Sequence, residues 1–115
     1  MTLLDRSMTD SAEVIRMIAG EWVEGERRPE PVRDGPWPCR LILDAPGAAD
    51  PRTGRQVIRG RAYIVPDAAP QAGDAVAISS VALGDAEWLV ASVTRLVRQG
   101  RELALEAAVT RIVDR

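Results

Sequence analysis

Apolar and polar residues alternate along the second half of the chain, which is the pattern of β-strands with one buried face. The alternating segments are residues 56–65, 75–83, 87–98 and 101–113. The last three are separated by the turn dipeptides Gly84-Asp85 and Gln99-Gly100. Strands joined by such short turns pair with their neighbours in the chain, so these three predict an antiparallel meander.

The phase of the alternation assigns side chains to faces. The residues predicted to share one face of segment 56–65 are Ile58, Gly60, Ala62 and Ile64, and those predicted on the opposite face are Val57, Arg59, Arg61, Tyr63 and Val65. In segment 75–83 the inward candidates are Val76, Ile78 and Leu83. Each segment therefore presents an apolar face to a core.

Segment 101–113 leaves two interpretations open. Its residues Leu-Ala-Leu-Glu-Ala-Ala have high helix propensity. The alternation, however, continues through the segment, and a two-residue turn precedes it. These two features favour a strand.

The first half of the chain is less regular. Residues 12–18 and 39–43 are the strand candidates, and residues 20–28 continue the first one irregularly. The prolines that follow are Pro29, Pro31, Pro36 and Pro38. They predict that this stretch is neither a helix nor a regular central strand. Residues 1–11 are expected to form an N-terminal arm, and residues 44–56, rich in Pro, Gly and Ala, a long loop.

Together these segments predict an all-β fold. Five to six antiparallel strands are expected to form a small barrel or sandwich, with an N-terminal arm and a long loop. A closed sheet would hide the strand edges. The length fits a single domain, residues 1–115, and the composition of 46% hydrophobic and 28% charged residues is that of a globular chain.

The residue inventory argues against catalysis. The chain contains no His and no Lys, and all fifteen of its basic residues are Arg. The commonest general base and the Schiff-base amine are therefore missing. Arg cannot replace either, because it stays protonated. Cys39, the single cysteine, begins an apolar run, which indicates a buried and unreactive thiol. We expect that the chain is not an enzyme.

Metal and cofactor sites find little support in the same inventory. Zinc and haem sites need His or several Cys ligands. Asp44 and Asp50 leave a calcium site open as an alternative, although turn formation is the favoured role for both. We expect no metal and no cofactor. No apolar run approaches the roughly 20 residues that span a membrane, and the net charge of -2 gives no general attraction to nucleic acid.

The three tryptophans are the candidates for protein contacts. Trp combines a large apolar surface with one hydrogen-bond donor and is favoured at interfaces. Trp88 lies inside the predicted meander, where core packing is the better interpretation. For Trp22 and Trp37, core and interface remain equally open. Leu3 and Leu4 are further interface candidates, since they could anchor the arm.

Three stretches together carry a resemblance to a known family. They are the arm Leu-Leu-Asp-Arg-Ser-Met-Thr-Asp before the first strand, the loop at residues 44–56, and the C-terminal run that contains Gly73-Asp74-Ala75-Val76 and Gly84-Asp85-Ala86-Glu87-Trp88-Leu89-Val90. In this order the chain resembles the head–tail connector proteins of tailed bacteriophages, particularly the head-closure or stopper type. Residues 20–38 match no part of that pattern.

The resemblance implies a homo-oligomeric ring at the neck of the virion, assembled in the bacterial cytoplasm. It implies portal or adaptor proteins and tail proteins as partners. DNA would pass through the ring without sequence-specific binding, and no membrane is involved. By position, the loop facing the channel would contain Asp44, Pro46, Gly47, Asp50, Pro51, Arg52, Gly54 and Arg55.

Two alternatives remain beside this interpretation. One is a related tail component, such as a tail terminator or a tail-tube subunit. The other is a generic β-barrel module that binds a small ligand or an oligonucleotide, for which exposed aromatic residues on one face would be expected.

Overall fold

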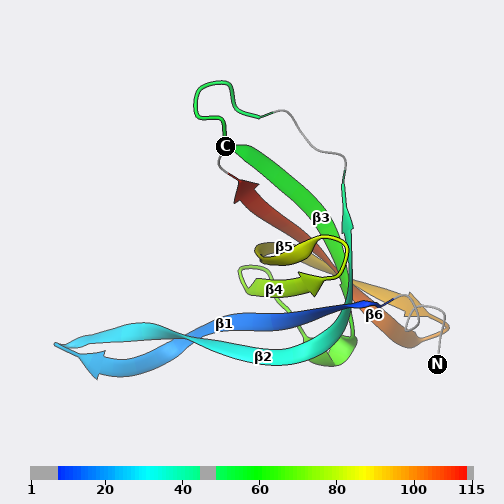
Figure 1. Cartoon of the computed structure of the whole chain (residues 1–115). Coiled ribbons are helices and arrows are strands. Elements are labelled where there is room, and N and C mark those ends of the chain that lie inside the picture. Colours follow the sequence, from blue (N-terminus) through cyan, green and yellow to red (C-terminus); the bar gives the residue numbers. More distant parts are fainter. Residues whose placement is uncertain (1–7, 45–48, 114–115) are drawn as a thin grey trace.

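The computed structural model describes residues 8–44 and 49–113, which form an antiparallel sheet of six strands (Figure 1). The strands are β1 (Asp10–Val23), β2 (Glu26–Leu43), β3 (Gln56–Ile64), β4 (Ala75–Ser80), β5 (Gly84–Arg98) and β6 (Arg101–Val113). A single turn of 3-10 helix, η1 (Pro66–Ala68), follows β3. Segment 101–113 is thus a strand throughout, despite its helix propensity.

The sheet closes on itself in the order β1-β2-β3-β6-β5-β4. It closes because β1 pairs with β2 along one edge and with β4 along the other. All six pairings are antiparallel. The prediction of a small all-β fold with five to six antiparallel strands is confirmed. β1 begins at Asp10, so the last two residues of the predicted arm belong to this strand.

The core fills the inside of the closed sheet, and every strand contributes to it. The largest fully buried side chains are Ile64, Ile78, Val14, Val76, Val90, Val109 and Cys39. The predicted faces of β3 are confirmed where Ala62 and Ile64 are buried and Arg61 is exposed. Trp88 is buried too, in agreement with its predicted role in core packing.

The proline-rich stretch is neither a helix nor a central strand, as predicted, and it belongs to an edge strand. These residues form the first part of β2, where β2 pairs with β1 alone, because pairing with β3 begins at Cys39. On such an open edge a residue without an N–H group removes no ladder hydrogen bond. Pro29 and Pro31, two residues apart, therefore fit with their nitrogens directed away from β1.

A β-bulge marks the place where β2 enters the closed sheet. Gly35 and Pro36 together lie opposite Glu13 of β1. Gly35 has a φ of 140°, a backbone conformation that residues with a side chain rarely adopt. A Cβ atom at this position would lie 2.8 Å from the carbonyl oxygen of Ala12. The bulge thus requires glycine.

The boundary between β4 and β5 differs from the expected one. β4 ends at Ser80, residues 81–83 form the turn, and Gly84 and Asp85 already belong to β5. Leu83, expected to point inward, is 47% exposed. Gly84, with a φ of 79°, is thus the first residue of β5 and follows the turn.

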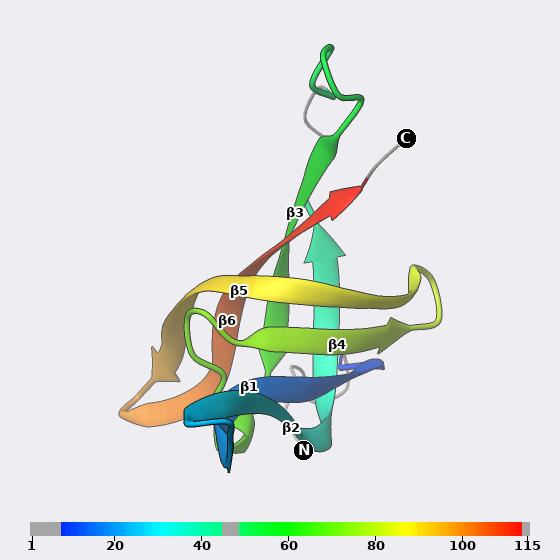
Figure 2. The same cartoon turned by 90° about the vertical axis from the view of Figure 1, so that its left-hand side faces the viewer.

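The chain is less compact than its length predicts. Its radius of gyration is 16.0 Å, against roughly 13 Å for a compact domain of this size. Its accessible surface is 7990 Å², whereas a monomer of this mass typically exposes about 6,200 Å². The β1–β2 hairpin projects from one side, and the ends of β3 and β6 project from another (Figures 1 and 2).

Candidate assembly surface

The β1–β2 hairpin leaves the closed sheet as a two-stranded ribbon (Figure 1). β1 pairs with β4 only as far as Ile15. Beyond it, β1 and β2 pair with each other alone, as far as the turn Glu24-Gly25. The φ angles of these turn residues are 53° and 81°, as a two-residue hairpin turn of type I′ requires. Residues 16–33 are called the ribbon below.

One face of the ribbon is apolar. Arg27, Pro29 and Pro31 share this face, because side chains alternate along a strand. Their partners on β1 have side chains on the same face. The partners are Trp22, Ala19 and Met17, respectively. We define the ribbon face as Met17, Ala19, Trp22, Pro29 and Pro31, with Arg27 beside Trp22.

Trp22 is the most prominent member of the ribbon face. Its side chain is 68% exposed, and Met17 is 60% exposed. The guanidinium carbon of Arg27 lies 5.6 Å from the centre of the indole ring, within the range of a cation–π contact. Of the two interpretations left open for Trp22, the structure thus excludes core packing within the chain.

Arg16 fastens the ribbon to the closed sheet. One of its terminal nitrogens donates hydrogen bonds of 2.7 and 2.8 Å to the carbonyl oxygens of Ala68 and Ala69. The same guanidinium lies 3.3 Å from the Asp34 carboxylate and 3.6 Å from that of Asp74. It therefore joins β1, β2 and the connection between β3 and β4. A planar group with five N–H donors suits this arrangement, and the single ammonium of Lys does not.

We expect Arg16→Met to lower the free energy of unfolding by about 1–3 kcal/mol, because two carbonyl oxygens lose a charged donor. Arg33→Met is the matched control. Arg33 makes one exposed ion pair of 3.4 Å with Glu13, and its loss should cost less than about 1 kcal/mol. Urea denaturation of both variants measures the difference. Equal effects would show that Arg16 does not fasten the ribbon.

Trp37 and Cys39 belong to the core side of β2. Trp37 is partly buried and packs against the core, so its indole contributes to the fold rather than to an exposed surface. Its N–H group and that of Trp88 are buried without a hydrogen-bond partner among the described residues. Cys39 is fully buried. Burial, assisted by the negative charge of Asp10, raises the pKa of its thiol to about 12, so the thiol stays protonated and unreactive near neutral pH.

The predicted channel loop is described only in part. Pro46 and Gly47 lie outside the described residues, as do Leu3 and Leu4 of the predicted arm. Asp44 is held at the start of the loop, where its N–H group donates to the Arg59 carbonyl oxygen and its carboxylate lies 3.4 Å from the Arg61 guanidinium.

The second part of this loop is a compact turn. The N–H group of Asp50 donates to the Arg55 carbonyl oxygen at 2.7 Å, and that of Gly54 donates to the Asp50 carbonyl oxygen at 2.8 Å. The Asp50 carboxylate accepts from the N–H group of Arg52 at 2.9 Å. Pro51 is exposed within this turn. Asp50 therefore acts as a turn-forming residue, and the turn lies apart from the ribbon (Figure 1).

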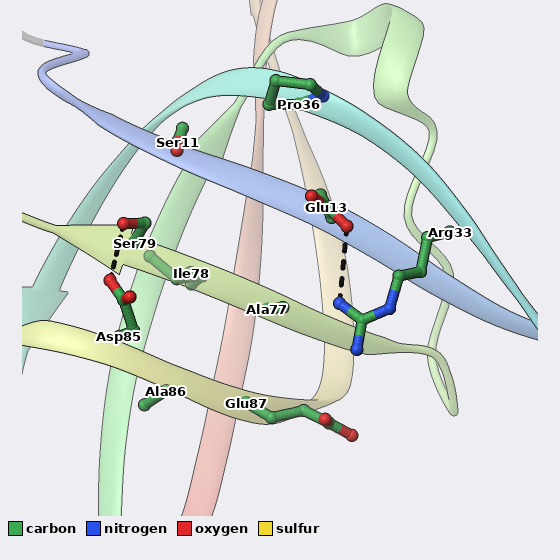
Figure 3. Close-up of a pocket in the computed structure, with 10 residues that line it drawn as sticks. All are labelled: Ser11, Glu13, Arg33, Pro36, Ala77, Ile78, Ser79, Asp85, Ala86 and Glu87. Carbon is green, nitrogen blue, oxygen red and sulfur yellow. Dashed lines mark hydrogen bonds and ion pairs between the residues drawn. The ribbon is translucent and has the colours of Figure 1, made fainter.

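A shallow groove of about 380 Å³ crosses the outer faces of β1, β4 and β5 (Figure 3). Two polar contacts lie in it: the ion pair of Arg33 with Glu13, and a 2.6 Å hydrogen bond from the Ser79 hydroxyl to the Asp85 carboxylate. A Ser beside a carboxylate lacks the base that takes its proton in the known hydrolytic triads, because the chain contains no His or Lys. The Ser79 hydroxyl in this groove therefore has no His or Lys beside it to take its proton.

A second hollow, of about 560 Å³, lies where the outer faces of β4, β5 and β6 meet. Leu89 and Ile112 line it, and they are 53% and 65% exposed. Glu87 and Arg111 bring opposite charges to the same hollow. The Arg111 guanidinium lies 5.5 Å from the ring centre of the buried Trp88. This hollow joins apolar surface with charges of both signs.

Most of the ribbon face and the whole second hollow were not predicted from the sequence. Met17, Ala19, Pro29 and Pro31 were not among the candidates, because the prolines hid the strand opposite β1. Gly25, a turn-forming residue after the first strand candidate, is the signal that could have revealed the hairpin. For Leu89 and Ile112, alternation alone does not show that two distant strands meet.

The described part of the chain contains no group of three acidic or cysteine residues arranged to hold a metal ion. Among the described residues, no helix has the length and hydropathy needed to cross a membrane. No protein-family model, no curated protein and no solved structure matches this chain.

Proposed function

We propose that this chain is a structural subunit that assembles through its ribbon, and that its assembly is a ring of the head-closure type at the neck of a tailed-phage particle. The observation that carries the assembly role is the apolar ribbon face. Met17 and Trp22 are mostly exposed on a hairpin that projects from the closed sheet. A monomer gains nothing from ordering such a surface in water, whereas an interface buries it.

The surface of the chain supports the same proposal. The chain exposes roughly 1,800 Å² more than a compact monomer of its mass. Each partner in a typical stable interface contributes about 800 Å². A subunit in a ring needs two such contacts, one for each neighbour, and an extended surface of this size can accommodate them.

The specific place at a phage neck rests on the resemblance. The arm, the loop at residues 44–56 and the C-terminal run follow the order of head–tail connectors. In the proposed ring the turn from Asp50 to Arg55 would face the channel, and the portal or adaptor and the tail proteins would contact the two sides of the ring. The ribbon has no counterpart in that pattern and would be a contact particular to this chain.

Light scattering coupled to size exclusion tests the assembly role. We expect a mass that is a multiple of the 12.5 kDa chain, either alone or once the portal and tail proteins of the same particle are added. Electron microscopy of the assembled fraction should then show rings. A chain that stays at 12.5 kDa up to its solubility limit and binds none of these proteins would refute the proposal.

A further inference from the structure

We propose that Trp22 of one copy of this chain inserts between Leu89 and Ile112 of a second copy. This inference rests on the proposed function, because it names the surface that receives the ribbon. The receiving surface is the second hollow, which belongs to β4, β5 and β6 and contains no residue of the ribbon.

The ribbon face and the second hollow both expose apolar side chains. Trp22 is 68% exposed, and the two aliphatic side chains of the hollow are 53% and 65% exposed. The hollow is open and measures about 560 Å³, which is enough to receive an indole ring. Aromatic side chains seated in apolar pockets provide much of the binding energy in protein interfaces.

Opposite charges flank the two apolar surfaces. Arg27 stacks on Trp22 and would enter the interface with it. Glu87 lines the hollow, and within the described residues it has no ion pair. Insertion of Trp22 therefore brings a cation beside an unpaired carboxylate, while Arg111, the cation of the hollow, is engaged over the Trp88 ring. Opposite charges around an apolar contact fix its orientation and exclude wrong partners.

One chain carries both the projecting Trp22 and the hollow. Trp22 lies near the end of the ribbon, and its exposure shows that it does not fill the hollow of its own chain. Each copy therefore offers one projecting Trp and one hollow open to receive it. A contact between two different patches of identical subunits is heterologous, and it closes into a ring when its rotation permits. The occupant of the hollow is thus a second copy.

A mixing experiment tests this contact. Trp22→Ala removes the projecting ring, and Leu89→Arg places a charge in the hollow. Both positions are exposed, so both variants should fold, which circular dichroism verifies. We expect each variant alone to lose assembly and to remain at the monomer mass. Mixed together, they should form a dimer with one chain of each, because the intact hollow of one receives the intact Trp22 of the other.

The control is Val97→Arg, an equivalent substitution at another exposed position of β5, which should assemble as the unaltered chain does. If Trp22→Ala abolishes assembly and Leu89→Arg does not, the ribbon binds elsewhere; the inference then fails while the assembly role stands. If both variants assemble normally, the inference fails as well. An unaltered chain that never assembles would instead overturn the proposed function itself.

A cross-link measures the contact directly and does not depend on the strength of a single interface. Arg27→Cys chains carrying a tag are mixed with untagged Glu87→Cys chains and oxidised. The native Cys39 is buried and protonated, so it does not compete. We expect a disulfide-linked pair with one chain of each kind. A mixture that gives neither this pair nor the mixed dimer overturns the inference.

Discussion

Ile64→Ala should lower the free energy of unfolding by about 2–5 kcal/mol, which is the range for truncating a fully buried aliphatic side chain. Ile64 is 0% exposed and lies on β3 between Cys39 of β2 and Leu105 of β6. Its loss leaves a cavity inside the closed sheet, where strands paired on both sides cannot easily move together. Chemical denaturation, with the midpoint and slope compared between variants, measures the change.

The control for this prediction is Val81→Ala. Val81 lies in the turn between β4 and β5 and is 98% exposed. Its truncation removes almost no buried surface, so stability should change by less than about 0.5 kcal/mol. Similar losses for Ile64→Ala and Val81→Ala would mean that the inside of the sheet is not a packed core.

Gly35→Val should destabilise the fold by at least about 2 kcal/mol, since two costs combine at this position. The φ of 140° is unfavourable for any residue with a side chain, at about 1–3 kcal/mol. The new Cβ atom would also lie 2.8 Å from the Ala12 carbonyl oxygen, which belongs to the backbone and cannot rotate away. The bulge that admits β2 into the closed sheet would therefore shift.

Gly25→Ala separates the two costs. Gly25 also has a positive φ, 81°, but a Cβ atom added there would meet nothing within 4 Å. This variant should lose only about 1 kcal/mol, from the backbone conformation alone. Thermal or chemical denaturation compares the pair. If both variants lose the same stability, the contact with Ala12 has no influence.

The predictable part of this fold is the part where one face is buried and the other meets water. β3 shows this, since Ala62 and Ile64 enter the core while Arg61 stays exposed. β6 is a strand although its residues favour a helix, because pairing with β3 and β5 outweighs a propensity of about a few tenths of a kcal/mol per residue.

The ribbon was harder to predict for a physical reason. The rest of the chain covers neither face of the ribbon. Apolar and polar residues therefore need not alternate along its strands, and alternation is the sequence pattern that predicts a strand. Its second strand contains prolines, which a central strand excludes and an open edge accepts. Whether an edge is open depends on where β3 begins to pair, at Cys39. The candidate hollow likewise depends on which strands become neighbours, a property of the closed sheet and not of any segment.

The prolines of β2 also determine how the ribbon can interact with other chains. Pro29 and Pro31 present no N–H group along the outer edge of β2. An added strand would find no donors at these positions, so the ribbon cannot grow into a wider sheet on that side, and the route to fibrous aggregation is closed there. Recognition at this edge must come from side chains. On its β2 side, the projecting hairpin can thus bind another chain through its tryptophan without also being a template for strand addition.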